Sequence, residues 1–240
     1  MSHTTIPTHI FIIPYRNREK ELQILVDTLP NILYRDGITN YQFFVIRQTD
    51  KKLFNRGMML NIGFLEVKKR YPHNWKTIQL ICHDVDIYPT KPNIINYNTI
   101  KGKVNHPYGV LRPHLNGTVG GICIITGEDY NLSGGHPNFF GWGGEDIGMS
   151  RRCQAKGIII DESKFIDRRT SPFIVDPESH PTPKELKFSQ ICDKRNLSKV
   201  FKENPAQPID TFNNINYQII SETNILTNIL MINVTGHTIF

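Results

Sequence analysis

The N-terminal part of the chain alternates between short apolar runs and amphipathic segments, and this alternation constrains the fold more than any other feature. Apolar runs rich in β-branched and aromatic residues predict strands at 9–13, 42–46 and 77–82. Apolar residues at helical spacing predict helices over about 19–33 and from about 54 to 70. Strands that alternate with helices in this way are typical of an α/β protein.

The rest of the chain is less regular, and its elements are predicted one at a time. Pro30 is expected to kink the first helix or to end it early. A helix is predicted from Glu145 to about residue 156, where Gly157 ends it. In chain order, the other expectations are a loop-rich region at 89–115, a strand at 120–126, a proline-rich loop at 171–183, and an apolar strand at 225–234 preceded by the segment 216–220.

The charge of the chain argues against a nucleic-acid-binding protein. The formal net charge is +6 at pH 7, but lysines and arginines are scattered, and the one short cluster, 68–70, is typical of the basic end of a helix. No nucleic-acid-binding motif accompanies this charge. A modest basic excess instead suits a small anionic ligand such as a nucleotide diphosphate.

The cysteines and the N-terminus carry no sign of a secreted or membrane protein. The four cysteines, at 82, 123, 153 and 192, are widely spaced and include no C-x-x-C pair, which favours reduced structural thiols over a metal site or a disulfide framework. Neither a signal peptide nor a membrane span is visible. The chain as given is therefore expected to be soluble, in the cytoplasm or elsewhere.

Polar residues follow the predicted strands at the edge where α/β proteins bind ligands. Arg16 and Arg18 come after the first strand, and Asp84 and Asp86 come after the third. Ligands bind beyond the carboxyl ends of the strands in such sheets. The two arginines suit pairing with a diphosphate, although ordinary surface charge is an equally good interpretation of either one alone.

The segment Asp84-Val85-Asp86 is a candidate metal and diphosphate clamp. Alternate residues of a strand share a face, so both carboxylates are expected to point the same way. A divalent ion held by hard oxygens stabilises charge on a leaving phosphate. His180 as a further ligand would favour manganese over magnesium, because imidazole suits softer ions. An Asp-x-Asp pair and a lone loop histidine are each weak signals by themselves.

The segment 139–146 joins a glycine-rich turn to two carboxylates. The indole of Trp142 offers a flat apolar face on which a sugar ring can rest. Glu145 and Asp146 supply hydrogen-bond acceptors and a candidate general base. The alternative is a plain turn with a buried Trp and an acidic helix start. For the segment 54–56, the alternative to ligand binding is likewise a helix cap made by Asn55 beside a buried Phe54.

Taken together and in order, these segments closely resemble the β-1,4-galactosyltransferase family, whose members are inverting glycosyltransferases of the GT-A fold. The resemblance rests on the ordered motifs PYRNR at 14–18, FNRG at 54–57 with LNIGF at 60–64, DVD at 84–86, GG at 120–121 and GWGGED at 141–146. It extends from about Ile10 to Val234. It implies a GT-A type, Rossmann-like α/β fold with a mixed central sheet flanked by helices. The chain would be a single domain, 1–240, with a nucleotide-binding part at about 8–90 and an acceptor and catalytic part at about 91–240.

The resemblance also assigns roles to residues. The donor-binding residues would be Pro14, Tyr15, Arg16, Asn17, Arg18, Phe54, Asn55, Arg56, Asp84, Val85, Asp86 and Trp142. The acceptor-binding residues would be Trp142, Gly144, Glu145 and Asp146. Asp146 would be the general base that deprotonates the acceptor hydroxyl, with Glu145 positioning the acceptor. Asp86 and His180 would hold Mn2+.

Three positions depart from the family pattern. Ile147 stands where the family commonly has a further carboxylate, which puts N-acetylglucosamine as acceptor in doubt. Pro177 replaces a methionine metal ligand, so that the ion has fewer protein ligands unless Asp176 or Glu178 substitutes. Thr118 stands where galactose-using members have a tyrosine, and the smaller side chain leaves room for an N-acetyl group on the donor sugar. The family's disulfide cysteines have no evident match.

The resulting prediction is a manganese-dependent inverting glycosyltransferase. It would move galactose or N-acetylgalactosamine from a UDP-sugar to a hydroxyl of a glycan or glycoconjugate. One alternative is a retaining enzyme similar to the polypeptide N-acetylgalactosaminyltransferases, although these typically have Asp-x-His at 84–86. The other is a catalytically silent module that binds carbohydrate or nucleotide sugar.

Overall fold

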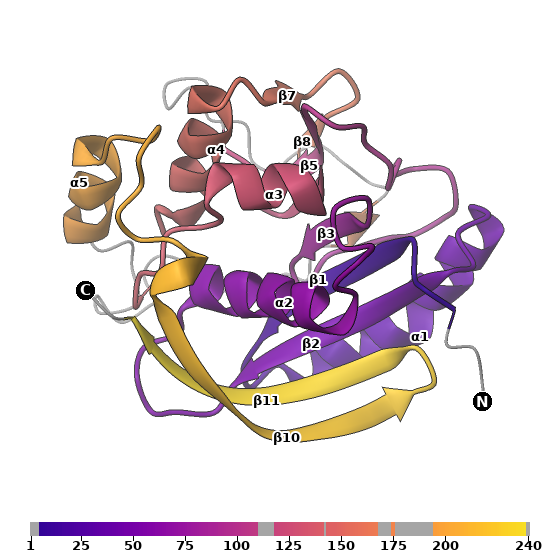
Figure 1. Cartoon of the computed structure of the whole chain (residues 1–240). Helices are drawn as coiled ribbons and strands as arrows, with labels where there is room; N and C mark the ends of the chain where they lie inside the picture. Colours follow the sequence, from indigo (N-terminus) through magenta and orange to yellow (C-terminus); the bar gives the residue numbers. More distant parts are fainter. Residues whose placement is uncertain (1–4, 110–117, 142, 168–173, 176–193, 239–240) are drawn as a thin grey trace.

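The computed structural model describes residues 5–109, 118–141, 143–167, 174–175 and 194–238 (Figure 1). The elements are, in order, β1 (His9–Tyr15), α1 (Glu19–Arg35), β2 (Tyr41–Gln48), α2 (Arg56–Arg70), β3 (Gln79–His83), β4 (Tyr88–Pro89), β5 (Lys103–Gly109), β6 (Ile122–Thr126), α3 (Gly127–Ser133), α4 (Glu145–Ala155), β7 (Ile159–Asp161), β8 (Ile166–Asp167), β9 (Ile174–Val175), α5 (Lys194–Lys202), the 3-10 turn η2 (Phe212–Asn214), β10 (Ile215–Leu226) and β11 (Ile229–Thr238).

One mixed sheet organises the described residues. Its strand order is β10-β11-β2-β1-β3-β6-β5-β7, with β8 paired to β5. The strands β11, β2, β1 and β3 are parallel neighbours, whereas β6 runs antiparallel to β3 and β5. The prediction of an α/β fold with a mixed central sheet is confirmed.

Helices cover both faces of the sheet because alternate strand residues point to opposite sides. In β1, Ile10 and Ile12 pack in the cluster that contains the apolar face of α2. Phe11 and Ile13 pack on the opposite side with α1. Figure 1 shows α2 in front of the strands and α1 behind them. Side chains on both faces are fully buried, which explains the nearly continuous apolar runs of the parallel strands.

Pro30 was expected to kink α1 or to end it early, and early ending is wrong, because the helix continues to Arg35. Leu29 and Leu33, on either side of the proline, are fully buried in the core. Their burial compensates for the hydrogen bond that proline cannot make.

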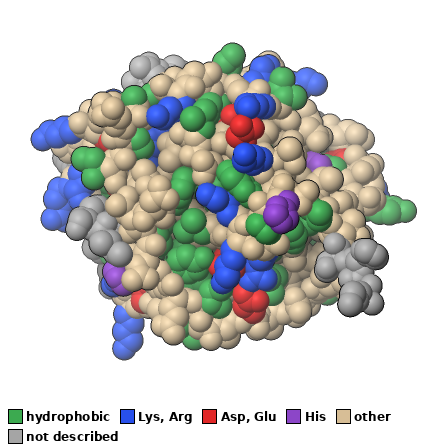
Figure 2. Space-filling model, viewed as in Figure 1, with side chains coloured by type: hydrophobic (Ala, Val, Ile, Leu, Met, Phe, Trp, Pro, Cys, Tyr) green, Lys and Arg blue, Asp and Glu red, His purple; other side chains and the backbone are tan. Residues whose placement is uncertain are grey.

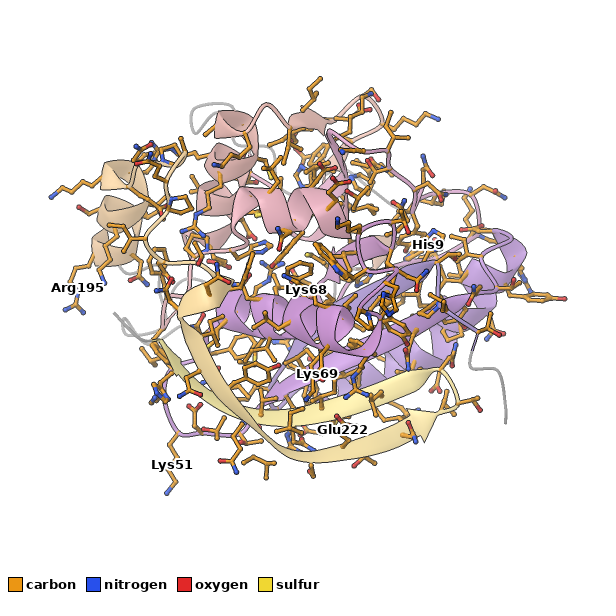
Figure 3. The ribbon with its side chains drawn as sticks, viewed as in Figure 1. His9, Lys51, Lys68, Lys69, Arg195 and Glu222 are labelled. Carbon is orange, nitrogen blue, oxygen red and sulfur yellow. The ribbon has the colours of Figure 1, made fainter. Side chains whose placement is uncertain are left out.

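The C-terminal strand predicted at 225–234 is confirmed only over 229–234, in β11, because the chain turns at 227–228 between β10 and β11. The two strands form an antiparallel hairpin, and β11 pairs in parallel with β2. Polar contacts fix the hairpin to α2. Buried Glu66 accepts a hydrogen bond from the Tyr217 hydroxyl at 2.6 Å and pairs with Arg70. Arg70 also pairs with Glu222 of β10, which is labelled in Figure 3.

Two regions predicted as loops contain strands. Within 89–115, β5 pairs with β6, β7 and β8. Within 171–183, the described pair Ile174–Val175 forms β9 and pairs with β4.

The basic side chains are scattered over the visible surface (Figure 2), and the described cysteines are reduced, as the sequence predicted. Lysines and arginines lie at several separate places on the face shown in Figure 2. Cys82, Cys123 and Cys153 are free and buried, and Cys192 lies outside the described residues. Among the helices that are described, none is long and apolar enough to cross a membrane.

Candidate active site

Residues from α2, α4 and the turn after β3 meet beyond the carboxyl end of the sheet. β3 ends at His83, and the turn that follows it contains Asp84, Val85 and Asp86. The prediction that these residues keep strand geometry is therefore wrong. Asp84 and Asp86 do not form one clamp in this structure. Each is paired with a different guanidinium, Arg56 and Arg18 respectively.

Arg56, the first residue of α2, is the centre of the site. Its Nε donates to Asp84 Oδ1 at 2.7 Å, and its Nη1 donates to Asp146 Oδ1 at 2.6 Å. The same Nη1 lies 3.7 Å from Glu145 Oε1. Burial acts to lower the pKa of Arg56, but attraction by Asp146, Asp84 and Glu145 outweighs it and holds the pKa well above its usual range. One buried guanidinium therefore joins the turn after β3 to the start of α4.

Glu145 and Asp146 open α4, immediately after Gly144. Gly144 has a φ of 97°, which favours glycine, and it turns the chain into the helix. Glu145 is 7% exposed, and burial followed by repulsion from Asp146 raises its pKa to about 7, although Arg56 opposes the shift. Asp146 keeps 27% of its side chain exposed, so it can reach a substrate.

Gly120 allows Asp146 to occupy its place. A Cβ at Gly120 would lie 2.5 Å from Asp146 Oδ2, closer than any real contact of this kind. Gly120, just before β6, is therefore in direct contact with the candidate base. The glycine motif and the Glu-Asp motif, separate in the sequence, form one wall.

The PYRNR segment lies at the end of β1. Asn17 has a φ of 51°, which places Arg18 at the cap position of α1. Arg18 Nη2 donates to Asp86 Oδ2 at 2.6 Å, and its Nε lies 3.1 Å from Glu21 Oε1. Pro14 and Tyr15 are the last residues of β1, and both are buried.

Arg16 and Phe54 form a second part of the candidate donor site. Both terminal nitrogens of Arg16 donate to the Lys52 carbonyl at 2.7 Å, and its guanidinium lies 5.8 Å over the ring of Phe54. Arg16 thus holds the loop before α2. The side chain of Asn55 accepts from Met58 N at 2.9 Å, so Asn55 caps α2, as the alternative interpretation of this segment had it.

Only part of the candidate metal site is described. The described residues contain no group of three or more histidine, cysteine or acidic side chains that could hold a metal. Trp142, His180 and positions 176–178 lie outside them. The residue that is described, Asp86, fits a cation, since its carboxylate is 9% exposed and holds the guanidinium of Arg18. Hard carboxylate oxygen is also a usual ligand for manganese.

Sequence reasoning missed a buried histidine behind this wall. His106 of β5 is 1% exposed, and its ring nitrogens lie 2.9 Å from the Gly120 carbonyl and 2.9 Å from Glu162 Oε1. His83, next to Asp84, bonds the Asp84 carbonyl through Nδ1 at 2.8 Å, and burial lowers its pKa to about 4. Neither histidine belongs to a motif, so no local signal pointed to them.

The architecture around this site matches solved glycosyltransferases. It superimposes on the catalytic domain of Drosophila β1,4-galactosyltransferase 7 in complex with xylobiose with a TM-score of 0.77 at 22% identity, covering 97% of this chain and 95% of that one. A mutant of the Drosophila enzyme in complex with manganese, UDP-Gal and xylobiose matches with a TM-score of 0.76 at 21% identity. The chain has the fold of a GT-A glycosyltransferase catalytic domain.

Family models and relatives narrow this class. The model for the N-terminal region of glycosyl transferase group 7 matches residues 4–98, and the model for the N-terminal domain of galactosyltransferase matches residues 105–173. The chain belongs to the β-1,4-galactosyltransferase family.

Three relatives show the range of names in this family. Human β-1,4-galactosyltransferase 4 is 33% identical over 62% of this chain and 43% of its own length. Pig β-1,4-galactosyltransferase 5 is 32% identical over 86% of this chain and 50% of its own length. A β-1,4-N-acetylglucosaminyl-transferase of Lymnaea stagnalis is 35% identical over 59% of this chain and 29% of its own length. The chain thus spans half or less of the length of these relatives.

Proposed function

We propose that the chain is a metal-dependent inverting glycosyltransferase that moves a hexose from a UDP-sugar to a hydroxyl of a glycan or glycoconjugate. The observation that carries this proposal is the Arg56 guanidinium, which bonds Asp84 on the candidate donor side and Asp146 on the candidate acceptor side. The two halves of the reaction would therefore meet at one point, as a direct displacement requires.

The proposed chemistry assigns Asp146 as the general base. Asp146 takes the proton of the acceptor hydroxyl as its oxygen attacks the anomeric carbon from the face opposite the diphosphate, so that UDP leaves and the configuration inverts. Glu145, buried beside it, positions the acceptor. Arg16 and Arg18 pair with the diphosphate. A manganese ion held by Asp86 and His180 would stabilise the negative charge of the leaving diphosphate.

The donor sugar is proposed to be galactose, with N-acetylgalactosamine also accepted. Thr118 is 8% exposed and precedes the glycine pair that contacts Asp146. Its side chain is small, and the names of the relatives include both a galactosyl and an N-acetylglucosaminyl transferase. Apolar Ile147, 6% exposed, argues against the family's usual contact with N-acetylglucosamine as acceptor.

The two parts of the chain are proposed to work as one unit. The nucleotide-binding part would span about 8–90 and the acceptor part about 91–240, and the two family models meet close to this border, between 98 and 105. The sheet supports the proposal because β3 of the first part pairs with β6 of the second.

The test is release of UDP from UDP-galactose and from UDP-N-acetylgalactosamine, with and without manganese, against a panel of sugar acceptors. Acceptor-stimulated, manganese-dependent release supports the proposal. A product of retained anomeric configuration would favour the polypeptide N-acetylgalactosaminyltransferase type. Donor binding without any release would favour a silent binding module. Failure to bind UDP-N-acetylgalactosamine while UDP-galactose binds would remove the second donor.

The variant Asp146→Asn separates enzyme from binding module. Loss of the base should lower turnover about 10²- to 10⁴-fold. UDP affinity should stay close to that of the wild type, because Arg56 keeps its bond to Asp84. Turnover that survives the substitution would contradict the role of Asp146.

A further inference from the structure

The candidate metal ligand Asp86 already has a cationic partner within the chain. Arg18 Nη2 donates to Asp86 Oδ2 at 2.6 Å, and the two side chains are 28% and 9% exposed. Arg18 also forms an ion pair with Glu21, whose Oε1 lies 3.1 Å from Arg18 Nε. The Arg18 carbonyl also accepts the first hydrogen bond of α1, from Leu22 N at 2.9 Å. The backbone of Arg18 is thus fixed, while its long side chain ends between two carboxylates.

A guanidinium and a divalent ion cannot share one carboxylate oxygen in this way. An ion must approach oxygen lone pairs within about 2.0–2.6 Å, the range for small divalent cations. The two cations would also repel each other at short distance. A metal on Asp86 therefore weakens the pairing of Arg18 with this carboxylate, whichever oxygen the ion takes. The departing guanidinium is then free to pair with an anion close by, and a diphosphate is a bidentate partner of the right charge.

We infer that Arg18 is a resident counter-ion of Asp86, which a divalent cation displaces and the donor diphosphate then captures. The inference rests on the proposed function, because it concerns the same site. Its consequence is a coupling between two ligands. Metal binding frees Arg18 for the diphosphate, and a diphosphate that captures Arg18 frees Asp86 for the metal, so each ligand strengthens binding of the other by the same factor.

The two directions of this exchange give Arg18→Ala an unusual signature. Removing the guanidinium removes a competitor of the metal, so Mn2+ should bind more tightly to the UDP-free protein, by about two- to fivefold, the range of a partly exposed ion pair. UDP should bind more weakly in the absence of metal, since one diphosphate contact is lost. The factor by which Mn2+ and UDP strengthen each other should shrink. A residue that serves only the structure, or only the diphosphate, would not tighten metal binding.

The experiment measures free Mn2+ by its electron paramagnetic resonance signal during titration with MnCl2, and UDP binding by calorimetry with and without Mn2+, on the full chain. Arg18→Lys keeps a cation beside Asp86, so its Mn2+ affinity should stay near that of the wild type. Lys20→Ala removes an equal charge from an exposed position on the same helix and controls for long-range electrostatics. Circular dichroism and thermal melting confirm that each variant is folded.

The outcomes separate this inference from the proposed function. Unchanged or weaker Mn2+ binding by folded Arg18→Ala overturns the exchange, even if the wild type binds Mn2+ and UDP as a transferase should. Equal tightening in Lys20→Ala overturns it too, because the effect would then be general charge. A wild-type chain that binds neither Mn2+ nor UDP overturns the exchange and the proposed function together. Should Arg18→Ala fail to fold, Arg18→Gln, which keeps most of the stem, is held to the same outcomes.

Discussion

At the scale of single residues, the candidate site contains more acidic than basic side chains. Three carboxylates, Asp84, Glu145 and Asp146, lie around one guanidinium, that of Arg56. Three acidic side chains around one basic side chain make an excess of acidic groups in a partly buried cluster. The structure resolves this excess at Glu145, whose pKa is raised to about 7 by burial and by Asp146. A proton on Glu145 near neutral pH lowers the negative charge around Arg56.

This proton makes stability depend on pH in a predictable direction. Folded Glu145 holds its proton up to about pH 7, whereas its ordinary value is 4.5. The contribution of Glu145 to stability is therefore fully present below pH 4.5 and is lost as the pH rises through 7. Between pH 5 and pH 8 the wild type should lose on the order of 2 kcal/mol more than Glu145→Gln. Urea unfolding of both proteins at the two pH values measures the difference, and parallel losses would contradict the assignment.

The close approach of Asp146 to Gly120 requires a glycine at this position. A Cβ there would lie 2.5 Å from Asp146 Oδ2, so Gly120→Ala should push the candidate base out of line. Turnover should fall about a hundredfold, as misplacement of a catalytic group by an ångström does, while UDP affinity changes little. The control is Gly236→Ala, where a Cβ meets its neighbours at 3.4 Å. Equal activity of the two variants would show that the close approach is unimportant.

At the scale of elements, the site depends on where α2 begins. The first turn of α2 contains no acidic residue that could stabilise the start of the helix. The side chain of Asn55 caps this start by accepting a 2.9 Å hydrogen bond from Met58 N. The backbone N–H of Asn55 in turn donates to Gln48 Oε1 at 2.8 Å, which connects the cap to the end of β2. Arg56 follows at once. The cap thus fixes the position from which the central guanidinium enters the site.

Removing this cap should therefore affect both stability and binding. Asn55→Ala should lower the free energy of unfolding by about 1 kcal/mol, the usual cost of a lost cap. Asn55→Ser, which keeps a capping oxygen, should recover most of it. UDP affinity should fall in the alanine variant because Arg56 loses its fixed starting point. Urea unfolding and calorimetry measure the two effects, and equal stability of the two variants would contradict the role of the cap.

Elements with a strong local pattern were predictable, and those without one were not. β1, α1, β2, α2 and β3 were found near their predicted positions because buried apolar runs and helical spacing are local signals. β5 was missed because Pro107 interrupts it and its other residues alternate poorly. The hairpin was misread because the polar pair at 227–228 lies inside an apolar run and marks a turn only when β2 is available as a partner for β11.

The site shows the same division. The order of the motifs predicted that the candidate residues share one site. In the structure, Arg56 contacts both Asp84 and Asp146. Which cation pairs with which carboxylate was not predictable. The Arg18–Asp86 pair joins residues 68 positions apart, and the Arg56–Asp146 pair joins residues 90 positions apart. The Arg18–Asp86 pair depends on the turn after β3, where the expected strand geometry does not apply, and the Arg56–Asp146 pair depends on how the starts of α2 and α4 meet.

At the scale of the whole molecule, the sheet is completed by its last strand. β11 lies between β2 and β10, and its buried residues Leu230, Ile232 and Val234 join the cluster under α2. Ile232→Ala should destabilise the protein by about 2–5 kcal/mol, since the side chain is fully buried. Ile220→Ala, on β10 and 54% exposed, should cost less than about 0.5 kcal/mol. Denaturant unfolding compares them, and similar losses would mean that the hairpin is not part of the core.

The position of β11 also bears on how the protein is made. The hydroxyl of Thr49, next to β2, donates a hydrogen bond to the carbonyl of Val234 in β11, 185 positions later in the sequence. A ribosome adding about 5–20 residues per second needs roughly 10–40 s to cover that span. During this time the edge of β2 has no partner from its own chain, and an unpaired apolar edge is prone to join other chains. The nascent protein should therefore depend on chaperones until β11 emerges and closes that edge.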